Sequence, residues 1–419
     1  MRMFRKLLTL DEAEKVIHRH FEPKPLGVEE VFLLEAHDRV LGEDMVATLD
    51  IPPFNRSTVD GYAVIAADTF GADENRPVRR KICGRVNAGE KPNTTVARGS
   101  VAEIVTGAPL PEGADAVVMS ESTKQENDDL YIYSAVAKNE NIMKTGADIR
   151  KGETVLRAGS VLGSREIGVL AAIGAAKVKV CLIPRVAVLS TGAEVTEPGE
   201  RLAAGRIYDI NAYSLSAAVS ESGAKPVYLG VFPDDKSELE RALKQALMSA
   251  DAVVTSGGVS VGPKDVVPRT VDSLGKPGII VSGIAAKPGK PTTVAVVDGK
   301  PVFSLPGHPT SALLIFHLLA SPIIRLMSGR KVHEAAEVKA FAAVRMFPAK
   351  GRRTFITIKL KWDMTDRLVA EPIPTGLSGA ITTLAKADGY VEIAENVQFV
   401  DAGEQVKVHL FRDAQEDLF

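Results

Sequence analysis

The residues most suited to chemistry form the segment Thr255-Ser-Gly-Gly-Val-Ser-Val-Gly262, with Asp265 just beyond it. The segment ends the apolar run 252–255, which is typical of a buried strand. Glycines at such a strand end let backbone N–H groups surround a phosphate, because they have no Cβ. A carboxylate beside that anion requires a bridging divalent cation or a polarised water. The segment therefore predicts a site for phosphate plus metal, with an ordinary tight turn as the alternative.

The same construction recurs twice along the chain. The apolar run 186–191 is followed by Gly192 and Glu194, and the run 302–305 leads into Pro306, Gly307 and His308. Open α/β folds bind ligands at the carboxyl edge of a parallel sheet, where such strand ends meet. The repetition predicts that the three segments line one crevice.

Basic residues are concentrated in Lys287-Pro-Gly-Lys-Pro291, where proline and glycine favour a stiff turn. Two ammonium groups held in this way suit a compact oxyanion. A solvated surface turn is the alternative, but the segment follows the strand candidate 279–284, so we expect it to open into the same crevice. Arg352 and Arg353, farther along the chain, are either a second cationic group or a solvated turn.

Apolar runs alternate with helical patterns over residues 184–329, which predicts right-handed βαβ units and a parallel sheet. The expected strands are 186–190, 226–231 and 252–256, and the expected helices are 211–222 and 236–249. Residues 50–139 contain short strand-like runs broken by glycine and proline, and residues beyond 330 alternate in the manner of strands. A capping-box pattern at Thr9 and Glu12 starts an expected helix that reaches about residue 20.

Composition limits the classes of function. A chain of 419 residues exceeds one ordinary core, so we expect about two to four domains. The 51 basic and 53 acidic side chains create no global field for nucleic acid or an anionic membrane. Cys83 and Cys181 form no metal-binding or disulfide pattern, and the longest apolar run, 312–320, is too short to span a bilayer. We expect a protein of the cytoplasm that binds neither nucleic acid nor membrane.

Six segments together resemble one known family, the molybdopterin molybdenumtransferases of molybdenum cofactor synthesis, which are related to the E domain of gephyrin. The segments span nearly the whole chain, in the order that the family has them. They are Pro53-Phe-Asn-Arg-Ser-Thr-Val-Asp-Gly-Tyr-Ala-Val64, Thr106-Gly-Ala-Pro-Leu-Pro-Glu-Gly-Ala-Asp-Ala-Val-Val118, Pro184-Arg-Val-Ala-Val-Leu-Ser-Thr-Gly192, Ser256-Gly-Gly-Val-Ser-Val-Gly262, Lys287-Pro-Gly-Lys-Pro291 and Leu305-Pro-Gly307.

The resemblance implies that molybdate is inserted into adenylylated molybdopterin, with Mg²⁺ assisting cleavage of the pyrophosphate link and release of AMP. It implies a homodimer with each cleft shared between subunits, and transient contacts with molybdopterin adenylyltransferase and molybdoenzyme acceptors. It also implies an α/β multidomain fold. The expected parts are an elongated discontinuous domain (1–48 and 140–183), an inserted β domain (49–139), a Rossmann-like molybdopterin-binding domain (184–329) and a β-barrel-like domain (330–419).

Site residues are carried over by position. The expected catalytic residues are Asp60, Thr106, Asp148, Glu194, Asp234 and Asp265, of which Glu194, Asp234 and Asp265 are expected to hold Mg²⁺. The expected ligand-binding residues are Thr191, Gly192, Ser256, Gly257, Gly258, Ser260, Gly262, Pro306 and Gly307, and the expected oxyanion pocket is Lys287, Lys290, Arg352 and Ser378. Clustered cations suit a dianion, whereas Mg²⁺ prefers carboxylate oxygens.

Two positions depart from the family pattern: Ala193 stands where many relatives have aspartate, and His308 where asparagine is common. Three alternatives stay open. A tungstate-inserting homologue would look the same in sequence. A molybdopterin adenylyltransferase resembles only residues 184–329, and a non-catalytic scaffold does not need the acidic and lysine residues.

Overall fold

The computed structural model describes residues 7–259, 266–332, 336–373 and 382–411. Four of the predicted site residues, Ser260, Gly262, Asp265 and Ser378, lie outside these ranges. The chain divides into two compact units, one of residues 1–29 with 181–419 and one of residues 30–180. Each unit is described by itself.

A six-stranded sheet forms the centre of the first unit, in the order β16-β13-β17-β21-β20-β18. Its strands are β13 (Arg185–Thr191), β16 (Lys225–Phe232), β17 (Ala252–Ser256), β18 (Pro277–Ser282), β20 (Thr293–Val297) and β21 (Lys300–Leu305). The pairs that join β16, β13, β17 and β21 are parallel, as predicted. Strand β20 is antiparallel to both of its neighbours, β21 and β18. The sheet is therefore mixed, and the antiparallel strand was missed by the sequence analysis.

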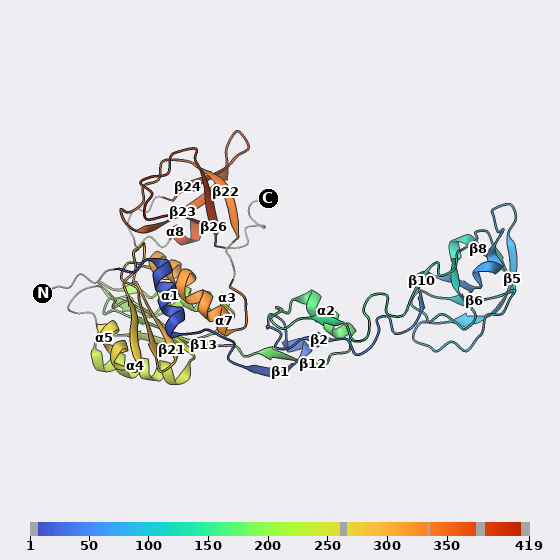
Figure 1. The fold of residues 1–419 in the computed structure, drawn as a ribbon, viewed down its shortest axis with the longest axis horizontal. Helices are drawn as coiled ribbons and strands as arrows, with labels where there is room; N and C mark the ends of the chain where they lie inside the picture. Colours follow the sequence, from blue (N-terminus) through green and yellow to red (C-terminus); the bar gives the residue numbers. More distant parts are fainter. Residues whose placement is uncertain (1–6, 260–265, 333–335, 374–381, 412–419) are drawn as a thin grey trace. The chain divides into compact units, whose positions relative to one another are not determined.

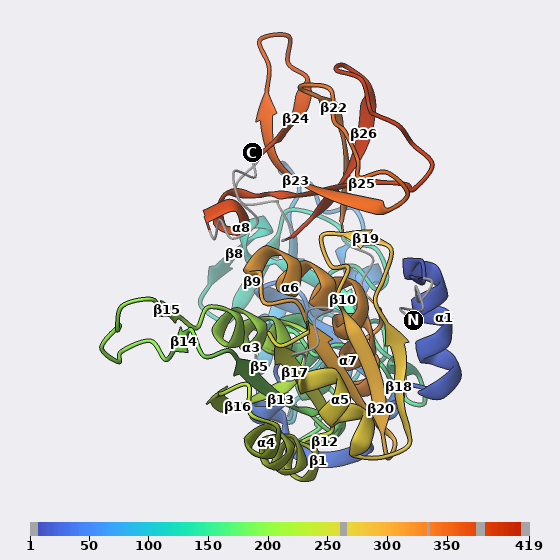
Figure 2. The same cartoon turned by 90° about the vertical axis from the view of Figure 1, so that its left-hand side faces the viewer.

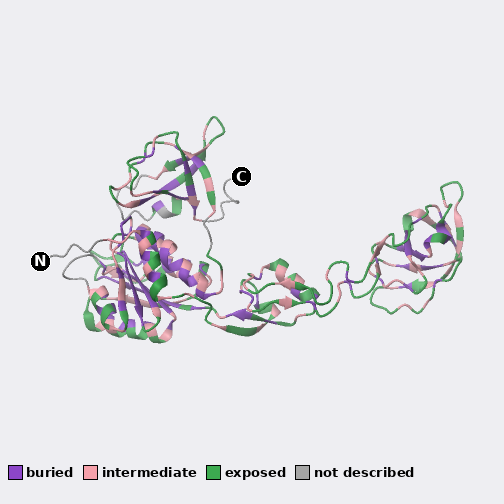
Figure 3. Cartoon of the chain, in the orientation of Figure 1, coloured by how far each residue is buried: buried purple, intermediate pink, exposed green. Residues whose placement is uncertain are grey.

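Helices cover both faces of this sheet (Figure 1). They are α1 (Leu10–His20), α3 (Asn211–Glu221), α4 (Lys236–Ser249), α5 (Val266–Ser273), α6 (Pro309–Ile315), the π-helical η4 (Phe316–Ala320) and α7 (Ser321–Met327). One core lies between the sheet and α1, α3, α6, η4 and α7, and a second lies between the sheet and α4 and α5. Many residues of these layers are buried, as are residues in the cores of the other parts of the chain (Figure 3).

Helix α1 begins where the capping box predicted, since the Thr9 side chain accepts from the Glu12 backbone and the Glu12 side chain accepts from the Thr9 backbone. Its buried residues Leu10, Ala13 and Ile17 pack into the core of the sheet. We expected this segment to belong to the same domain as the rest of residues 1–48. In the structure it packs on the central sheet instead. The apolar face of the helix does not by itself identify the partner surface.

The stretch Pro309–Met327 is 19 residues long and apolar enough to cross a bilayer by length and composition. More than half of it is buried within the protein. Its side chains Phe316, Leu319 and Ile323 belong to the core beneath the sheet, which accounts for the apolar composition.

The remainder of the first unit is a β-barrel made by β22 (Glu337–Ala342), β23 (Arg353–Trp362), β24 (Leu368–Pro372), β25 (Gly389–Ile393) and β26 (Gln405–Leu410). Strand β23 pairs with both β24 and β25, which closes the ring. The short strand β19 (Ala286–Lys287) also pairs with β23. It belongs to residues 283–292, which contain Lys287 and Lys290 and are called the lysine loop below. The predicted barrel-like fold of the C-terminal region is confirmed.

The second unit contains another six-stranded sheet, in the order β7-β4-β6-β5-β9-β8. These strands are β4 (Gly61–Val64), β5 (Val78–Val86), β6 (Ser100–Ile104), β7 (Ala116–Met119), β8 (Thr123–Glu126) and β9 (Asp129–Ile132). Helix α2 (Ser164–Ala172) packs in a separate core with residues such as Leu41 and Leu162. Three short two-stranded pairs join segments that are far apart in sequence. They are β1 (Val28–Phe32) with β12 (Lys177–Cys181), β2 (Met45–Val46) with β11 (Thr154–Leu156) and β3 (Arg56–Ser57) with β10 (Ile142–Met143).

Candidate functional site

Three of the predicted segments meet at one edge of the central sheet. In the parallel register, Ser190 of β13 lies beside Ser256 of β17, which lies beside Leu305 of β21. Thr191, Gly257 and Pro306 follow these residues directly. The structure therefore brings the three strand ends together, as the repeated pattern predicted.

Gly257 and Gly258 have positive φ angles of +92° and +63°, and each approaches Thr191 too closely for a side chain. A Cβ on Gly258 would lie 2.8 Å from Thr191 Oγ1 and 2.6 Å from Val267 Cγ2. The Gly257 N–H donates to the Leu305 carbonyl at 3.2 Å. The N–H groups of Gly258 and Val259 have no such bond within the residues that the structure describes. This turn can therefore offer backbone donors to an anion.

Two predicted carboxylates lie at the neighbouring strand ends. Gly192 has φ +145°, and a Cβ there would lie 2.8 Å from Glu194 Oε2, so the Glu194 side chain folds back over this glycine. The Gly192 N–H donates to the Phe232 carbonyl at 3.2 Å, which joins the end of β13 to the end of β16, just before Asp234. Asp234 is exposed, but partial desolvation of its carboxyl raises its pKa, and the Glu194 charge raises this pKa further. The two carboxylates thus repel each other.

A pair of carboxylates in mutual repulsion is a donor set that suits a divalent cation. Within the described ranges, no group of three or more His, Cys, Asp or Glu side chains has the arrangement of a metal site. Glu194 and Asp234 could hold a divalent cation such as Mg²⁺, an ion that keeps several of its waters when protein ligands are few. The predicted third ligand, Asp265, lies outside the described residues.

The lysine loop lies at the same edge of the sheet. Ser282 at the end of β18 pairs with Thr293 of β20, and Thr293 pairs with Ser304 of β21, so residues 283–292 connect at the level of the other strand ends. Lys287 and Lys290 are exposed. Neither forms an ion pair with any residue that the structure describes. Both charges are available to an external anion.

Gly289, between the two lysines, is buried with φ +117°. A Cβ there would lie 2.5 Å from Ile315 Cγ1. The Gly289 carbonyl accepts from Thr292 Oγ1 at 2.7 Å, and the Lys290 carbonyl accepts from the Ile284 N–H at 3.1 Å. The loop is therefore a defined turn, packed on the core.

The two arginines that the sequence left undecided have different environments. Arg353 is 17% exposed in its side chain and forms ion pairs with Asp11, Glu392 and Glu395. It is therefore committed to joining α1 to the barrel. Arg352 forms no ion pair with the described residues. It lies two residues before Thr354, which pairs with Lys287 in the β19–β23 ladder. Of the two arginines, Arg352 is therefore the candidate that joins Lys287 and Lys290 in the oxyanion pocket.

The remaining predicted residues belong to the second unit. The Asp60 carboxylate accepts from the Thr106 backbone N–H at 2.6 Å and from Thr106 Oγ1 at 2.9 Å. These hydrogen bonds hold the pKa of the exposed Asp60 carboxyl below its usual value. Asp148 is also exposed, and its backbone N–H donates to the Ile51 carbonyl. Asp60 and Thr106 act together, and the expectation that these residues reach the strand-end site stays a prediction.

Sequence analysis missed two buried residues beside the strand ends, Asp209 and Asn211. Asn211 Nδ2 donates to Ser256 Oγ and to the Gly307 carbonyl, both at 2.7 Å. Asp209 Oδ1 accepts from Ser190 Oγ at 3.0 Å and from the Ala212 N–H at 3.1 Å. An Asp and an Asn directly before a helical pattern are typical capping residues, so a signal was present.

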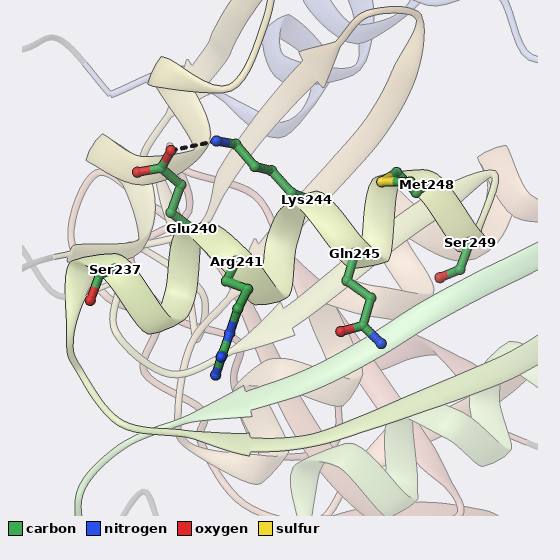
Figure 4. Close-up of a pocket in the computed structure, with 7 residues that line it drawn as sticks. All are labelled: Ser237, Glu240, Arg241, Lys244, Gln245, Met248 and Ser249. Carbon is green, nitrogen blue, oxygen red and sulfur yellow. Dashed lines mark hydrogen bonds and ion pairs between the residues drawn. The ribbon is translucent and has the colours of Figure 1, made fainter.

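A cavity of about 770 Å³ lies away from this site. It is a depression along α4, and the side chains that line it all project from that helix (Figure 4). Two of them, Glu240 and Lys244, form an ion pair at 2.7 Å. None of the predicted site residues lines it. The candidate site is defined by converging strand ends and charges, and the predicted site residues Ser260, Gly262 and Asp265 lie outside the described residues.

Comparison with known proteins accounts for almost the whole chain. Residues 8–174 match the model of the MoeA N-terminal region (domain I and II), residues 187–326 match a probable molybdopterin binding domain, and residues 339–411 match the MoeA C-terminal region (domain IV). The chain belongs to the molybdopterin molybdenumtransferase family. This family comprises transferases of molybdenum cofactor biosynthesis.

Individual members of the family are similar over their full length. A putative molybdopterin biosynthesis protein of Methanocaldococcus jannaschii is 34% identical over 98% of this chain and 100% of its own. Molybdopterin molybdenumtransferase 2 of Mycobacterium tuberculosis is 35% identical over 90% of this chain and 93% of its own. The crystal structure of a molybdopterin biosynthesis MoeA protein from Pyrococcus horikosii matches with a TM-score of 0.84 and 42% identity, over 97% of this chain and all of that one. The multidomain fold is therefore that of MoeA proteins.

The shape of the lysine loop can be tested with Gly289→Ala. A methyl group there requires an unfavourable positive φ and overlaps Ile315, so we expect the free energy of unfolding to fall by about 3 kcal/mol. Gly299→Ala is the matched control, since Gly299 also has a positive φ (+82°) but nothing within 4 Å of the added Cβ. We expect about 1 kcal/mol for the control, measured by urea denaturation. Equal losses would show that the loop does not pack on Ile315 as described.

The repulsion between the two carboxylates can be tested with Glu194→Gln. We expect the pKa of Asp234 to fall towards its ordinary value, and not all the way, because partial desolvation is the larger cause of its increase. Because its folded-state pKa is raised, the Asp234 carboxyl stabilises the fold at pH values below its unfolded-state pKa of about 3.9. This stabilisation is lost as the pH rises through the folded-state pKa. Glu194→Gln should therefore lose less of this stabilisation than the wild type between the unfolded-state and folded-state pKa values of Asp234. Carbon-13 NMR titration of the carboxyl measures the pKa, with Glu197→Gln as a control that should leave it unchanged.

Proposed function

We propose that the chain inserts molybdenum from molybdate into adenylylated molybdopterin, with Mg²⁺-dependent release of AMP, to form the molybdenum cofactor. The observation that carries this proposal is the order of groups along one sheet edge. Carboxylates follow β13 and β16, glycines follow β17 and β21, and two lysines that form no ion pair with a described residue lie between β18 and β20. The substrate contains a diphosphate between two larger groups, and its reaction partner is a dianion.

Each part of the edge has chemistry for one part of the reactants. The Gly257–Gly258 turn offers N–H donors to phosphate oxygens, while Lys287, Lys290 and Arg352 attract the oxyanion electrostatically. Neighbouring strands lie about 4.8 Å apart, so the three strand steps from β13 to β20 separate the acidic and basic ends by roughly 14 Å. Phosphate and oxyanion can therefore bind at the same time without competing.

Glu194 and Asp234 would hold Mg²⁺, because their mutual repulsion is relieved by a cation. Bound there, Mg²⁺ would neutralise charge on the diphosphate as the link to AMP is cleaved. The two carboxylates keep a negative potential at this end, which disfavours a second oxyanion beside the leaving phosphate. Asp265 is a third proposed ligand from the family pattern, outside the described residues.

The pairing of Asp60 with Thr106 supports a role for the second unit as well. Asp60 is exposed, ionised and held by two hydrogen bonds, so it is ready to meet a ligand. We propose that Asp60, Thr106 and Asp148 complete the cleft of a second subunit in a homodimer. The chain would receive its substrate from molybdopterin adenylyltransferase and pass its product to molybdoenzyme acceptors. Both transfers would take place through transient contacts in the cytoplasm.

The alternatives are less well supported. A lone adenylyltransferase would leave the matched N-terminal and C-terminal regions without a purpose. A scaffold does not need two carboxylates at one end of a sheet edge and two lysines at the other. Tungstate and molybdate are both tetrahedral dianions, so their selection is decided by experiment.

The direct test is AMP release from adenylylated molybdopterin with purified protein and Mg²⁺, without oxyanion or with a series of molybdate or tungstate concentrations. We expect release to depend on Mg²⁺ and on an oxyanion, and the ion that acts at the lower concentration is the physiological one. No release with either ion from the folded protein would contradict the proposal.

The role of the lysine loop predicts a specific defect in Lys290→Ala. Loss of a charge-assisted hydrogen bond costs about 1.5–3 kcal/mol, so the molybdate concentration for half-maximal AMP release should rise at least about tenfold. Binding of AMP itself should change little. Lys276→Ala is the matched control, because Lys276 is another exposed lysine before a proline, at the opposite end of β18. A normal molybdate dependence in Lys290→Ala would remove this residue from the oxyanion site.

A further inference from the structure

The two residues at the start of α3 are unusually buried for polar side chains so close to a ligand site. Asp209 is 4% exposed and Asn211 is 8% exposed. Asp209 follows β15 (Ile207–Tyr208), which pairs with β14 (Val195–Thr196) in an arm beside α3 (Figure 2). Burial of such groups is costly unless hydrogen bonds compensate for the lost water.

Asn211 connects two of the three strand ends. One Nδ2 hydrogen reaches Ser256 Oγ and the other reaches the Gly307 carbonyl, each at 2.7 Å. An amide nitrogen has two hydrogens, so both donors are used. Ser256 Oγ in turn donates to the Pro306 carbonyl at 3.4 Å. The segment after β21 is thereby held against the residue that precedes the Gly257–Gly258 turn.

Asp209 connects the third strand end and fixes Asn211. Its Oδ1 accepts from Ser190 Oγ of β13 and from the Ala212 N–H in the first turn of α3. The helix therefore begins at a fixed position relative to β13, and Asn211 lies in that first turn. Asp209 and Asn211 together join the ends of β13, β17 and β21.

This network is not closed within the residues that the structure describes. Asp209 Oδ2 and Asn211 Oδ1 are buried acceptors without a hydrogen-bond partner there. Asp209 has no ion pair with a described cationic residue either. Polar groups retained in this state beside a binding site are better explained by function than by stability.

We propose that Asp209 and Asn211 are positioning residues for the phosphate-binding turn. They set the separation between Gly307 and the Gly257–Gly258 turn, and so determine whether the N–H groups of Gly258 and Val259, which have no partner among the described residues, converge on a phosphate. Gly307 and Gly257 are in fact adjacent, since a Cβ on Gly307 would lie 3.7 Å from the Gly257 Cα. The inference rests on the proposed function, because it concerns the phosphate of an adenylylated substrate.

The test compares binding of AMP and adenosine, with Mg²⁺, to the full-length protein by isothermal titration calorimetry. Asn211→Leu keeps the approximate shape of the side chain and removes both donors. We expect its AMP affinity to fall about tenfold, as for the loss of one or two hydrogen bonds, while adenosine affinity is unchanged. If Asn211 had a purely structural role, the variant would bind both AMP and adenosine more weakly.

Two further variants separate positioning from misfolding. Asp209→Asn keeps an oxygen that can accept from Ser190 and Ala212, so it should retain most of the AMP affinity, whereas Asp209→Ala should match Asn211→Leu. Ser216→Ala is the control on the same helix, because Ser216 Oγ is buried and unpartnered but outside the network. It should bind AMP like the wild type.

Amide hydrogen exchange without ligand distinguishes failure of this inference from failure of the proposed function. We expect faster exchange of the Gly257 N–H, which is bonded to Leu305, in Asn211→Leu and not in Ser216→Ala. Wild-type protein that binds no AMP would contradict the proposed function, while changed exchange would still support positioning. Unchanged exchange with an unchanged ratio of AMP to adenosine affinity would overturn the inference.

Discussion

The end of the central strand β17 lies so close to the end of β13 that no side chain fits between them. Gly257 and Gly258 occupy this position, and a Cβ on either would overlap Thr191. Their positive φ angles turn the chain at the sheet edge, which leaves backbone N–H groups without partners among the described residues. Close packing and ligand binding therefore depend on the same two glycines.

The mixed order of the sheet determines how charge is distributed along this edge. Because β16 and β13 are at one side and the β18–β20 connection is at the other, carboxylates and lysines are separated by the glycine-containing strand ends. Had Glu194 or Asp234 been beside Lys287 or Lys290, ion pairs would neutralise both groups. The separation keeps a site for a cation and a site for an anion within the reach of one elongated substrate.

Sequence reasoning predicted the elements that have strong local signals. Helix α4 and strand β17 were predicted at their observed bounds, and the three strand ends converge as expected. The antiparallel strand β20 was missed, although Asp298 and Gly299, both with positive φ, are a typical hairpin turn before β21. Asp209 and Asn211 were missed because their partners are distant in sequence and only the folded sheet brings them together. Whether Arg352 or Arg353 is free also depends on tertiary contacts, since Asp11 and Glu395 are far from both in the chain.

In the proposed site, one sheet edge binds the oxyanion at its lysine end and the nucleotide phosphate at its glycines. Crystals of the protein with molybdate, AMP and Mg²⁺, measured by anomalous diffraction at the molybdenum absorption edge, locate both ligands in one experiment. We expect an anomalous peak beside Lys287 and Lys290, with the AMP phosphate at Gly257 and Gly258. A molybdenum peak beside Glu194 and Asp234, or ordered molybdenum away from this edge, would contradict this arrangement.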